Sequence, residues 1–562
     1  MNIRFLEGQA GDPLQERRNT LAKTAAIHAA DAVGVADAVA SVSYRSAGRT
    51  LVVGSAAQAL PWADHLAASL PVTVLLLDGE DQAGARAYPV FAAPSIAVAG
   101  WLGAFEARWQ APGQPVQQAK FDLVLDLCPS PLIASHQHPH GYYAPGADEA
   151  ARRAAAAELV EMTGDFEKPK YFAYKERLCA HSRNGQTGCN ACVQICSAKA
   201  ISGAGDKIRV NPYLCAGCGA CTTVCPTGAL GYAYPSAAHT GSRIKAALHA
   251  YREAGGQDPV LLFHSEAGAA LLEALQAAPD GEVAGGIPGR VIPMALHHTA
   301  STGIDVWFSA LAYGAAGVTV LMTGAEAPQY TAALDHQMGI AHTVLDGLGY
   351  AGPHFQLLRV STPEELGVAL RHAPRGEAPA ETATFNLAQD KRNTLDYALE
   401  HLHRHAPQQP QQVALPTGSP FGAIAVDTTK CSLCMACVGA CPSSAVMDTP
   451  DLPQLRFVEQ NCVQCGLCAN TCPENAIALV PRMTFGEARR KTVILNQSQP
   501  FHCIRCSKPF GTLHMVENML SRLSQHSAFA GKLDRLRMCG DCRVIDMMQP
   551  EGEFAVPLRR PQ

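Results

Sequence analysis

The chain has 562 residues, of which 48% are hydrophobic and 17% are charged, so it is long enough to form several domains. Its net charge is −5, with 44 basic and 49 acidic residues and no block of lysine or arginine, which argues against a nucleic-acid partner. The chain begins MNIRFLEGQAGDPLQERRN, without an apolar signal core, and its most apolar long run, 303–322, contains Asp305. We therefore expect a cytoplasmic protein without a membrane span.

Cysteine is the most informative residue type in this sequence. Of the 21 cysteines, Cys128 stands alone and the others form five groups of four. Disulfide frameworks are typical of small secreted domains, whereas thiols in a reducing compartment stay free to bind metal. The five groups therefore indicate metal or cluster ligands.

The first part of the chain predicts an N-terminal helical segment, 1–48, and an α/β domain, 49–170. The runs TLVVGS, VTVLLLDG and FDLVLDL predict strands, and QALPWADHLAASL predicts an amphipathic helix. No complete G-x-G-x-x-G pattern is present, which argues against a dinucleotide site. We interpret Cys128 as a buried apolar residue, and the histidines of SHQHPHGYY (135–143) as part of an ordered surface loop rather than a metal site.

A dense cysteine motif comes next and is repeated along the chain. The stretch CAGCGACTTVCPTGAL (215–230) has the spacing C-x2-C-x2-C-x3-C followed by proline, and it recurs at 431–446 and 462–477. A relaxed copy, C-x9-C-x2-C-x3-C, begins at Cys179 and has Ser197 in place of the proline. Three closely spaced thiolates can surround one iron–sulfur cluster in a tight loop, and loop glycines let the backbone approach it.

The motif resembles that of bacterial ferredoxins with two [4Fe-4S] clusters, and the resemblance covers two modules, 171–236 and 426–482. In that family the fourth cysteine of each motif binds the cluster of the other motif. The resemblance therefore implies four [4Fe-4S] clusters, with these ligand sets: Cys196, Cys215, Cys218 and Cys221; Cys179, Cys189, Cys192 and Cys225; Cys431, Cys434, Cys437 and Cys472; Cys441, Cys462, Cys465 and Cys468. Cys179 departs most from the spacing, and a three-iron cluster would result if it did not bind.

Residues 243–375 predict a second α/β domain. The strands PVLLFHS, RVIPMAL and VTVLMTG alternate with helical stretches, which predicts a parallel sheet. This order resembles the iron–sulfur delta subunit associated with hydrogenase and heterodisulfide reductase complexes. That family carries cysteines for a two-iron cluster at the strand ends, where this chain has Phe263-His264-Ser265, Ala295-Leu296-His297-His298 and Thr323-Gly324-Ala325.

Since none of these positions is cysteine, we interpret the second α/β domain as a docking surface. Its three strand-end histidines, His264, His297 and His298, are expected to be solvated or hydrogen-bonded. The proline- and glutamine-rich stretch that follows predicts a linker, 376–425, before the second ferredoxin module.

The C-terminal tail, 483–562, contains the fifth group of cysteines. Cys503 and Cys506 form one C-x2-C pair, Cys539 and Cys542 form another, and LHMVENMLSRL between them predicts a helix. Two such pairs are typical of a zinc site of the zinc-ribbon kind, and also of a single rubredoxin-like iron. We favour zinc, with a role in folding the tail.

The sequence thus predicts a multidomain α/β and α+β protein, in which two dicluster modules are interleaved with parallel-sheet α/β domains and followed by a small zinc-ribbon-like tail. We expect an electron-transfer protein that passes electrons between redox protein partners. Large ferredoxin-type proteins of this kind accompany formate dehydrogenases, which the resemblance suggests as a partner. Two alternatives stay open: an assembly factor for a multi-subunit redox enzyme, and an oxidoreductase with its substrate site in an α/β domain. No catalytic residues are expected, because the chain lacks a nucleophile elbow, a P-loop and a dinucleotide motif.

Overall fold

The structure is a computed structural model that describes residues 12–78, 86–111, 113–277, 286–449, 452–524 and 533–548. The chain divides into two units, Met1–Glu176 with Asn190–Gln409, and Arg177–Cys189 with Pro410–Gln562. Within the described residues, no helix combines the length and the apolar character that a membrane span needs.

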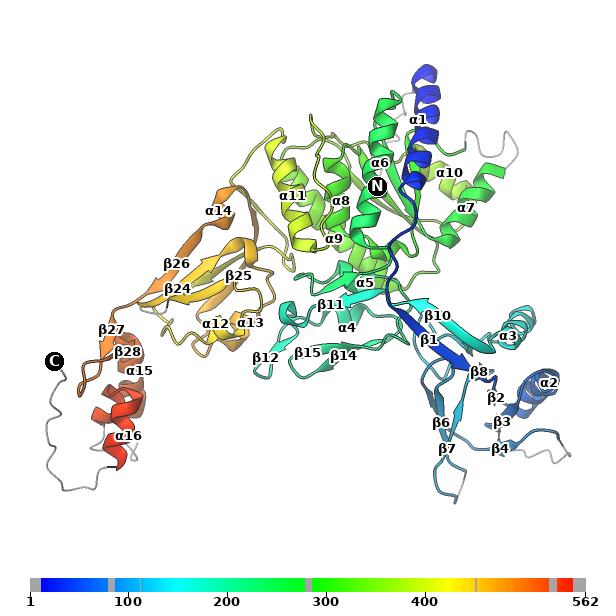
Figure 1. Ribbon diagram of the computed structural model, residues 1–562, viewed down its shortest axis with the longest axis horizontal. Coiled ribbons are helices and arrows are strands. Elements are labelled where there is room, and N and C mark those ends of the chain that lie inside the picture. Colours follow the sequence, from blue (N-terminus) through cyan, green and yellow to red (C-terminus); the bar gives the residue numbers. More distant parts are fainter. Residues whose placement is uncertain are drawn as a thin grey trace, which may run out of the picture. The chain divides into compact units, whose positions relative to one another are not determined.

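The first unit contains a parallel five-stranded sheet, the first sheet, in the order β4-β3-β2-β8-β9 (Figure 1). Alternate residues of its strands face two different layers, because side chains in a strand point to opposite faces. Val52 and Leu125 pack with two helices, whereas Leu51 and Val124 pack with an antiparallel three-stranded sheet. The strands and helices of these layers are β2 (Thr50–Gly54), β3 (Val72–Leu76), β4 (Val90–Ala92), β8 (Leu123–Asp126), β9 (Tyr142–Tyr143), α2 (Ala56–Leu66), α3 (Glu149–Glu161), β5 (Ile96–Ala99), β6 (Phe105–Trp109) and β7 (Gln117–Phe121).

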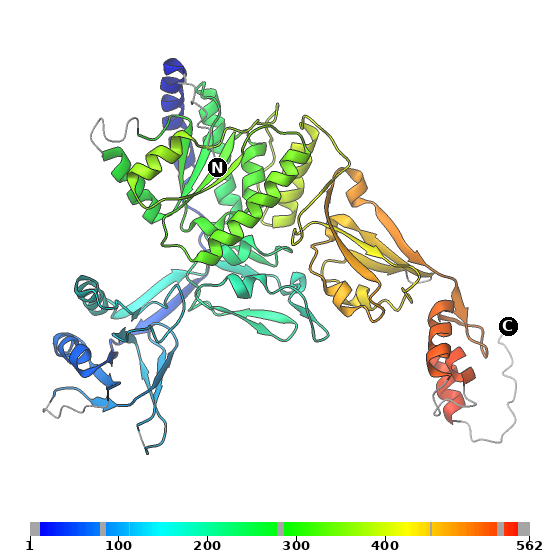
Figure 2. The same ribbon diagram turned by 180° about the vertical axis from the view of Figure 1, so that it is seen from behind.

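A second parallel sheet, with the order β18-β17-β19-β20, lies in the same unit and is surrounded by helices (Figure 2). Its central strands are buried along their whole length, which is why they are almost entirely apolar. The elements are β17 (Val260–His264), β18 (Val291–Ala295), β19 (Gly317–Met322), β20 (Phe355–Arg359), α6 (Ala237–Glu253), α7 (Glu266–Ala277), α8 (Ile304–Ala312), α9 (Pro328–Gly347), α10 (Pro363–Arg371) and α11 (Lys391–Arg404).

Helix α1 (Pro13–Ala32) packs along α6, although more than 200 residues of sequence separate the two helices (Figures 1 and 2). The Lys23 ammonium donates to the carbonyl of Ile287 at 2.8 Å, and the Glu16 carboxylate accepts from the N–H of Gly289 at 2.5 Å. Helix α1 of the expected N-terminal helical segment therefore packs with the second sheet, whereas residues 41–46 of that segment form strand β1 and not helix. Residues 1–11 of that segment lie outside the described residues.

Short elements of the first unit carry the first group of cysteine motifs. Helices α4 (Ala191–Ile195) and α5 (Ala220–Thr223) pack together, and strands β11 (Phe172–Tyr174) and β16 (Leu230–Tyr232) pair antiparallel. The remaining strands form two antiparallel pairs, β1 (Ser41–Ser46) with β10 (Gly164–Pro169), and β14 (Ile201–Ala204) with β15 (Lys207–Val210).

The second unit has a similar pair of short helices, α12 (Ala436–Ala440) and α13 (Leu467–Thr471). Two antiparallel sheets frame them, in the orders β21-β25-β22 and β23-β24-β26, and the tail adds a hairpin and two helices. The elements are β12 (Ser182–Arg183), β13 (Gln186–Thr187), β21 (Gln412–Ala414), β22 (Gly422–Val426), β23 (Val446–Thr449), β24 (Leu452–Val458), β25 (Ile477–Thr484), α14 (Glu487–Arg490), β26 (Thr492–Gln497), β27 (Pro500–His502), β28 (Pro509–Thr512), α15 (Leu513–Leu523) and α16 (Gly540–Met548).

The fold class expected from the sequence is confirmed: a multidomain α/β and α+β protein with parallel sheets. The expected linker, 376–425, differs from the structure, because it contains the 14-residue helix α11. Leu395, Ala398, Leu399 and Leu402 form the buried face of this helix, and the Asp390 side chain caps its N-terminus. The last residues of the expected tail, 549–562, lie outside the described residues.

Candidate cluster and metal sites

The three regular cysteine motifs share one backbone conformation. In each motif the residue before the second cysteine and the residue after it are left-handed: Gly217 and Gly219 (φ 77° and 76°), Leu433 and Met435 (55° and 60°), Gln464 and Gly466 (53° and 80°). This turn directs backbone N–H groups toward the sulfur two residues earlier: the Gly217 N–H lowers the pKa of Cys215, and the Leu467 N–H lowers that of Cys465. Burial is the larger effect on both thiols and raises their pKa. The loops thus supply hydrogen bonds to thiolates.

The fourth cysteine of each motif also has a repeated environment. A left-handed residue lies three positions after each of them, at Lys199, Gly228, Ser444 and Asn475. The chain then turns so that a backbone N–H donates to the cysteine sulfur. These bonds are Ala200 N to Cys196 Sγ (3.2 Å), Leu230 N to Cys225 Sγ (3.5 Å), Ala445 N to Cys441 Sγ (3.3 Å) and Ala476 N to Cys472 Sγ (3.3 Å). The relaxed first motif therefore shares this feature with the regular ones.

Three of the four expected cysteine sets come together, each with the fourth cysteine of the other motif. Cys196 lines one cavity with Cys215, Cys218 and Cys221. Cys472 lines another cavity with Cys431, Cys434 and Cys437. In the third set, the charges of Cys465, Cys462 and Cys441 add to burial and raise the pKa of Cys468 to about 12.

The cysteine sets of the ferredoxin-like motifs surround cavities, whereas the C-terminal group has the geometry of a single-ion site. The four ligand atoms of the C-terminal group lie within 4.8 Å of one another. In a four-iron cluster each cysteine binds a different iron atom, so the four thiols enclose a space for the cluster. Four thiols, a cavity between them and surrounding N–H donors therefore fit an iron–sulfur cluster.

The remaining expected set is divided between the two units. Cys192 and Cys225 belong to the first unit, whereas Cys179 and Cys189 belong to the second. The ligand set that joins the two pairs therefore stays a prediction.

The segment 177–189 packs against the second dicluster motif. Asn184 and Gly185 are both left-handed and form the two-residue turn of the β12–β13 hairpin. The Asn470 side-chain amide donates to the Thr187 carbonyl at 3.1 Å, and an added Cβ at Gly188 would lie 2.7 Å from Leu467. The Cys189 thiol is close enough that its charge raises the pKa of Cys465.

Within the first unit, the C-terminal edge of the second sheet lies against the cysteine loop 215–221. The His297 ring stacks on Tyr171 with 4.9 Å between centroids, and a Cβ on Gly219 would lie 2.6 Å from the Ser301 Cβ. His298 Nδ1 accepts from the Ala300 N–H, and burial lowers the pKa of His298 to about 4. The strand-end edge of the second α/β domain therefore contacts the chain's own motif 215–225, and the interpretation of the domain as a docking surface stays a prediction.

Other histidines that the sequence singled out contact backbone carbonyl groups. His264 is buried, and its Nδ1 lies 3.1 Å from the Ser265 carbonyl. In the loop 135–143, His136 is exposed and contacts the Ala325 carbonyl through Nε2 at 3.0 Å. None of these histidines belongs to a group of possible metal ligands among the described residues. Cys128 is buried, as expected, in the core between the first sheet and β5–β7.

A lysine near the motif 215–225 could not be predicted from the sequence. The Lys168 ammonium donates to the carbonyls of Tyr213 at 3.0 Å and Cys215 at 2.8 Å. Burial lowers the pKa of Lys168 to about 8, although the charge of Cys215 raises it. Lys168 lies on β10, 47 residues before Cys215, and only the fold brings them together.

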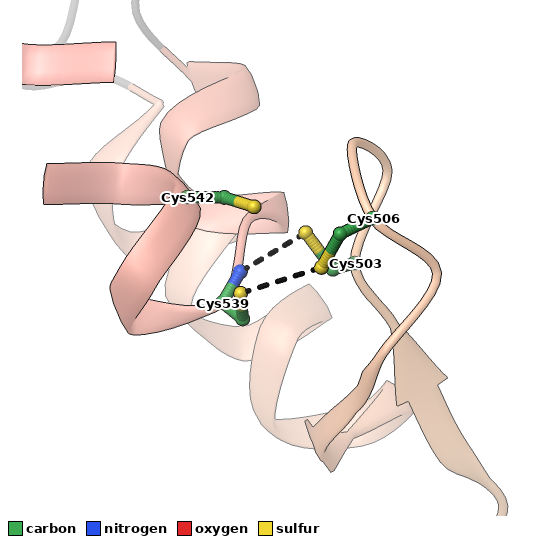
Figure 3. A group of neighbouring side chains, drawn as sticks. All are labelled: Cys503, Cys506, Cys539 and Cys542. Atoms are coloured by element: carbon green, nitrogen blue, oxygen red, sulfur yellow. Dashed lines mark hydrogen bonds between the residues drawn. The ribbon is translucent and has the colours of Figure 1, made fainter. Parts of the chain in front are cut away.

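The C-terminal cysteines form a separate group (Figure 3). Cys503 and Cys506 lie on the turn between β27 and β28, and Cys539 and Cys542 lie at the start of α16. The Cys506 and Cys539 sulfurs are 3.6 Å apart, and the Cys539 N–H donates to Cys503 Sγ at 3.3 Å. Burial would raise the pKa of Cys503, but N–H groups of Cys539, Cys506 and Arg505 lower it to about 6. Four converging thiols with one low-pKa member fit a tetrahedral zinc or iron site.

Comparisons with known proteins agree with the two dicluster modules. Two family models, each described as a 4Fe-4S dicluster domain, match residues 187–229 and 430–477. These matches bear out two iron–sulfur modules of the ferredoxin kind. A comparison with curated proteins finds no match.

Proposed function

We propose that the protein is an electron carrier whose two dicluster modules hold four [4Fe-4S] clusters. The observation that carries this proposal is the repeated pairing of three cysteines of one loop with the fourth cysteine of the partner motif. A [4Fe-4S] cluster, when bound, gains or loses one electron without a bond to an organic substrate. The chain's part is to hold the clusters, keep water away and set their potentials through hydrogen bonds and nearby charges.

The sixteen cysteines of the four motifs are proposed as the ligands. The sets are Cys196, Cys215, Cys218 and Cys221; Cys179, Cys189, Cys192 and Cys225; Cys431, Cys434, Cys437 and Cys472; Cys441, Cys462, Cys465 and Cys468. The structure supports three sets by proximity, and the second rests on the motif spacing.

The segment 177–189 suggests where electrons pass between the modules. Cys189 is proposed as a ligand of the second set and Cys465 as a ligand of the fourth, and these two thiols are neighbours within the second unit. The two clusters that they bind would therefore exchange electrons directly. The cluster at Cys434, whose side chain is exposed, would then face a protein partner.

The partners are proposed to be cytoplasmic redox proteins. None of the 21 cysteines forms a disulfide in the structure, which suits thiols that bind metal in a reducing compartment. A formate dehydrogenase is the partner that the resemblance to large ferredoxin-type proteins suggests. For the C-terminal group we propose a structural zinc ion bound by Cys503, Cys506, Cys539 and Cys542.

A second candidate function is an oxidoreductase with its own small-molecule site. A cavity of about 260 Å³ lies in the first unit, between the first cysteine motif and α8. Thr222 and Tyr232 line both this cavity and the one that the first cysteine set surrounds. A molecule bound there would lie beside the first cluster. Mass spectrometry of small molecules released from the purified protein distinguishes this candidate from a carrier.

Iron and sulfide analysis tests the proposed function. Anaerobic reconstitution is expected to give about sixteen iron atoms and as many sulfides per chain, since each cluster contributes four of each. Replacing Cys462, Cys465 and Cys468 together by alanine should remove about four of each. The matched control is Cys128→Ser, which changes a cysteine outside the motifs and should leave iron unchanged. An iron content near eight in the unaltered chain would contradict the proposal.

A further inference from the structure

A hydrogen-bond network from outside the ferredoxin-like motif reaches one of its cysteines. The Tyr330 hydroxyl, in the first turn of α9, donates to Cys218 Sγ at 3.0 Å. The Ser197 Oγ lies 2.8 Å from Gln137 Oε1 and is also bonded to the Tyr330 hydroxyl. Because Tyr330 gives its single proton to sulfur, the Ser197 hydroxyl is the donor at the contact with Tyr330. Tyr330 Oη is also 3.3 Å from Gln137 Oε1. All four residues belong to the first unit.

Three separate parts of the chain build this network. Gln137 comes from the loop 135–143, Ser197 directly follows Cys196, and Tyr330 follows the end of β19 in the second sheet. Tyr330 is 0% exposed and Ser197 is 4% exposed, so their hydroxyls exchange little with water. The His298 ring packs edge-on against the Tyr330 ring at 5.3 Å and limits its movement.

The contact of Ser197 with Tyr330 accounts for the serine that follows the fourth cysteine of the relaxed motif, where the regular motifs have proline. The equivalent residue in the other three motifs is proline: Pro226, Pro442 and Pro473. Proline has no hydroxyl, so it could not hold Tyr330. The serine therefore makes a hydrogen bond to Tyr330 that a proline at this position could not make.

The direction of the bond to sulfur follows from chemistry. A cluster-bound cysteine is a thiolate and carries no proton, so only Tyr330 can donate at this contact. A hydrogen bond to a charged acceptor is stronger than one to a neutral acceptor. The reduced cluster carries one more negative charge than the oxidised cluster and gains more from the bond. The bond therefore raises the reduction potential.

We propose that Tyr330, held by Ser197 and Gln137, raises the reduction potential of the cluster at Cys196, Cys215, Cys218 and Cys221 above that of the same cluster without the bond. This inference rests on the proposed function, since it assumes a cluster at this set. Tyr330 is a positioning and tuning residue, and it does not take part in electron transfer itself. Cys434, the second cysteine of the motif 431–441, is exposed, and the cluster proposed there serves as an internal reference in the same chain.

Redox titration of the full-length, reconstituted protein tests the inference. Tyr330→Phe removes the donor and keeps the ring, so one of the four one-electron steps should shift to lower potential. We expect about a tenfold fall in the ratio of reduced to oxidised cluster at a fixed potential, equivalent to about 59 mV. The other three steps should not move. The Fe–S(Cys) stretching bands in resonance Raman spectra should shift in the same sample.

Two further variants make the test specific. Tyr232→Phe removes another phenol beside the same cluster, but Tyr232 donates to the Gly217 carbonyl at 2.6 Å and not to sulfur. This variant should shift the potential much less than Tyr330→Phe. Ser197→Ala keeps the tyrosine but removes its support, and should give a smaller shift in the same direction. It also provides the test if Tyr330→Phe loses iron.

The outcomes separate this inference from the proposed function. Iron content near sixteen with unchanged potentials in both Tyr330→Phe and Ser197→Ala would overturn the inference and leave the carrier function standing. An equal shift in Tyr232→Phe would overturn it too, because the effect would then come from any lost hydroxyl. Low iron in the unaltered chain would instead contradict the proposed function.

Discussion

Left-handed residues in the cysteine loops are the smallest features on which the cluster sites depend. Position 219, position 435 and position 466 are equivalent in the three regular motifs, and they hold Gly, Met and Gly at φ 76°, 60° and 80°. Met435 shows that a side chain can adopt this conformation in one loop. Glycine is required at Gly219 for a second reason, because the Ser301 backbone approaches within 2.7 Å of where a Cβ would lie. At Gly466 the nearest atom would be 3.9 Å away.

The glycine pair gives a matched prediction. Gly466→Ala should cost about 1–2 kcal/mol, the price of a left-handed conformation for a residue with a Cβ. Gly219→Ala carries the same cost and must also displace Ser301, so its thermal unfolding should begin at a lower temperature and its cluster should be lost faster. Thermal denaturation followed by cluster absorbance measures both. Equal behaviour of the two variants would show that the second sheet does not constrain the first cysteine loop.

Cys179 is the proposed ligand that the sequence supports least, and the prediction at this position is spectroscopic. The unaltered protein should show no three-iron signal by electron paramagnetic resonance in its oxidised state. Cys179→Ser should show one, because the cluster would keep three thiolates and lose the iron at the fourth. Cys128→Ser, at another buried cysteine, is the control and should show none. A three-iron signal already present in the unaltered protein would mean that Cys179 does not bind.

Spacing within a short loop predicts which three thiols of a motif meet, and the fourth cysteine of each set was implied by the resemblance to ferredoxins. Three of the four sets come together in the structure. The sequence does not predict Lys168 or Tyr330, which lie 47 and 112 residues from the cysteines that they contact. Ser197 was visible as a departure from the motif, but its partner Tyr330 was not. In the stretch 135–143 the sequence pointed to the histidines as possible ligands, whereas the residue that contacts the cysteine motifs is Gln137, through Ser197. Contacts between distant segments depend on the tertiary fold and leave no local pattern.

The helices and strands could be predicted from hydrophobic periodicity where one face, or the whole element, is buried. Strands β2, β3, β8, β17, β18 and β19 and helices α2, α7, α8, α9 and α15 fall on the stretches expected. The edge strands β4, β9 and β20 were not predicted, and β9 lies in the stretch 135–143 that we expected to be a surface loop. Helix α11 was missed because a proline- and glutamine-rich stretch follows it and dominated the interpretation of 376–425. The packing of α1 on α6 had no sequence signal, because the buried face of α1 consists mostly of alanines, Ala22, Ala26 and Ala30, and gives no strong apolar pattern.

The C-terminal hairpin and α16 give a prediction at the same scale. Apart from the four cysteines, few buried apolar side chains join β27–β28 to α16, and Phe510 and Met538 pack only at the edge of the cysteine group. Cys506→Ser should therefore release zinc and make the tail sensitive to protease, while cluster absorbance stays unchanged. Ile504→Ala, between the same two cysteines and 52% exposed, should keep the metal. If the metal that Cys506→Ser loses is iron and not zinc, the C-terminal site would be redox-active.

The whole molecule consists of two units, each with its own pair of cysteine helices. The sequence suggested that an α/β domain and a linker separate the two modules. The segment 177–189 adds a detail to this picture, because it carries two cysteines of the first motif and belongs to the second unit. Its Cys189 lies beside Cys465, where we propose that electrons cross.

Cys465 therefore tests the path. In Cys465→Ala the cluster proposed at Cys441, Cys462 and Cys468 should be damaged, and electrons should no longer pass through the chain. The first module should still accept electrons from a chemical reductant. Stopped-flow absorbance can follow both steps, with Cys128→Ser as the control. Undiminished transfer to the partner enzyme in Cys465→Ala would show that the path bypasses this cluster.

We propose that the protein carries electrons and depends on partner proteins for its chemistry. The most direct measurement is the visible absorbance of the reconstituted clusters, under anaerobic conditions, after adding NADH, NADPH or formate to the purified chain alone. The clusters should stay oxidised with each of these compounds, should be bleached by dithionite, and should then stay reduced until an acceptor enzyme recovered with the native protein is added. Bleaching of the clusters by a nicotinamide cofactor or formate without any partner would contradict the carrier and support an enzyme.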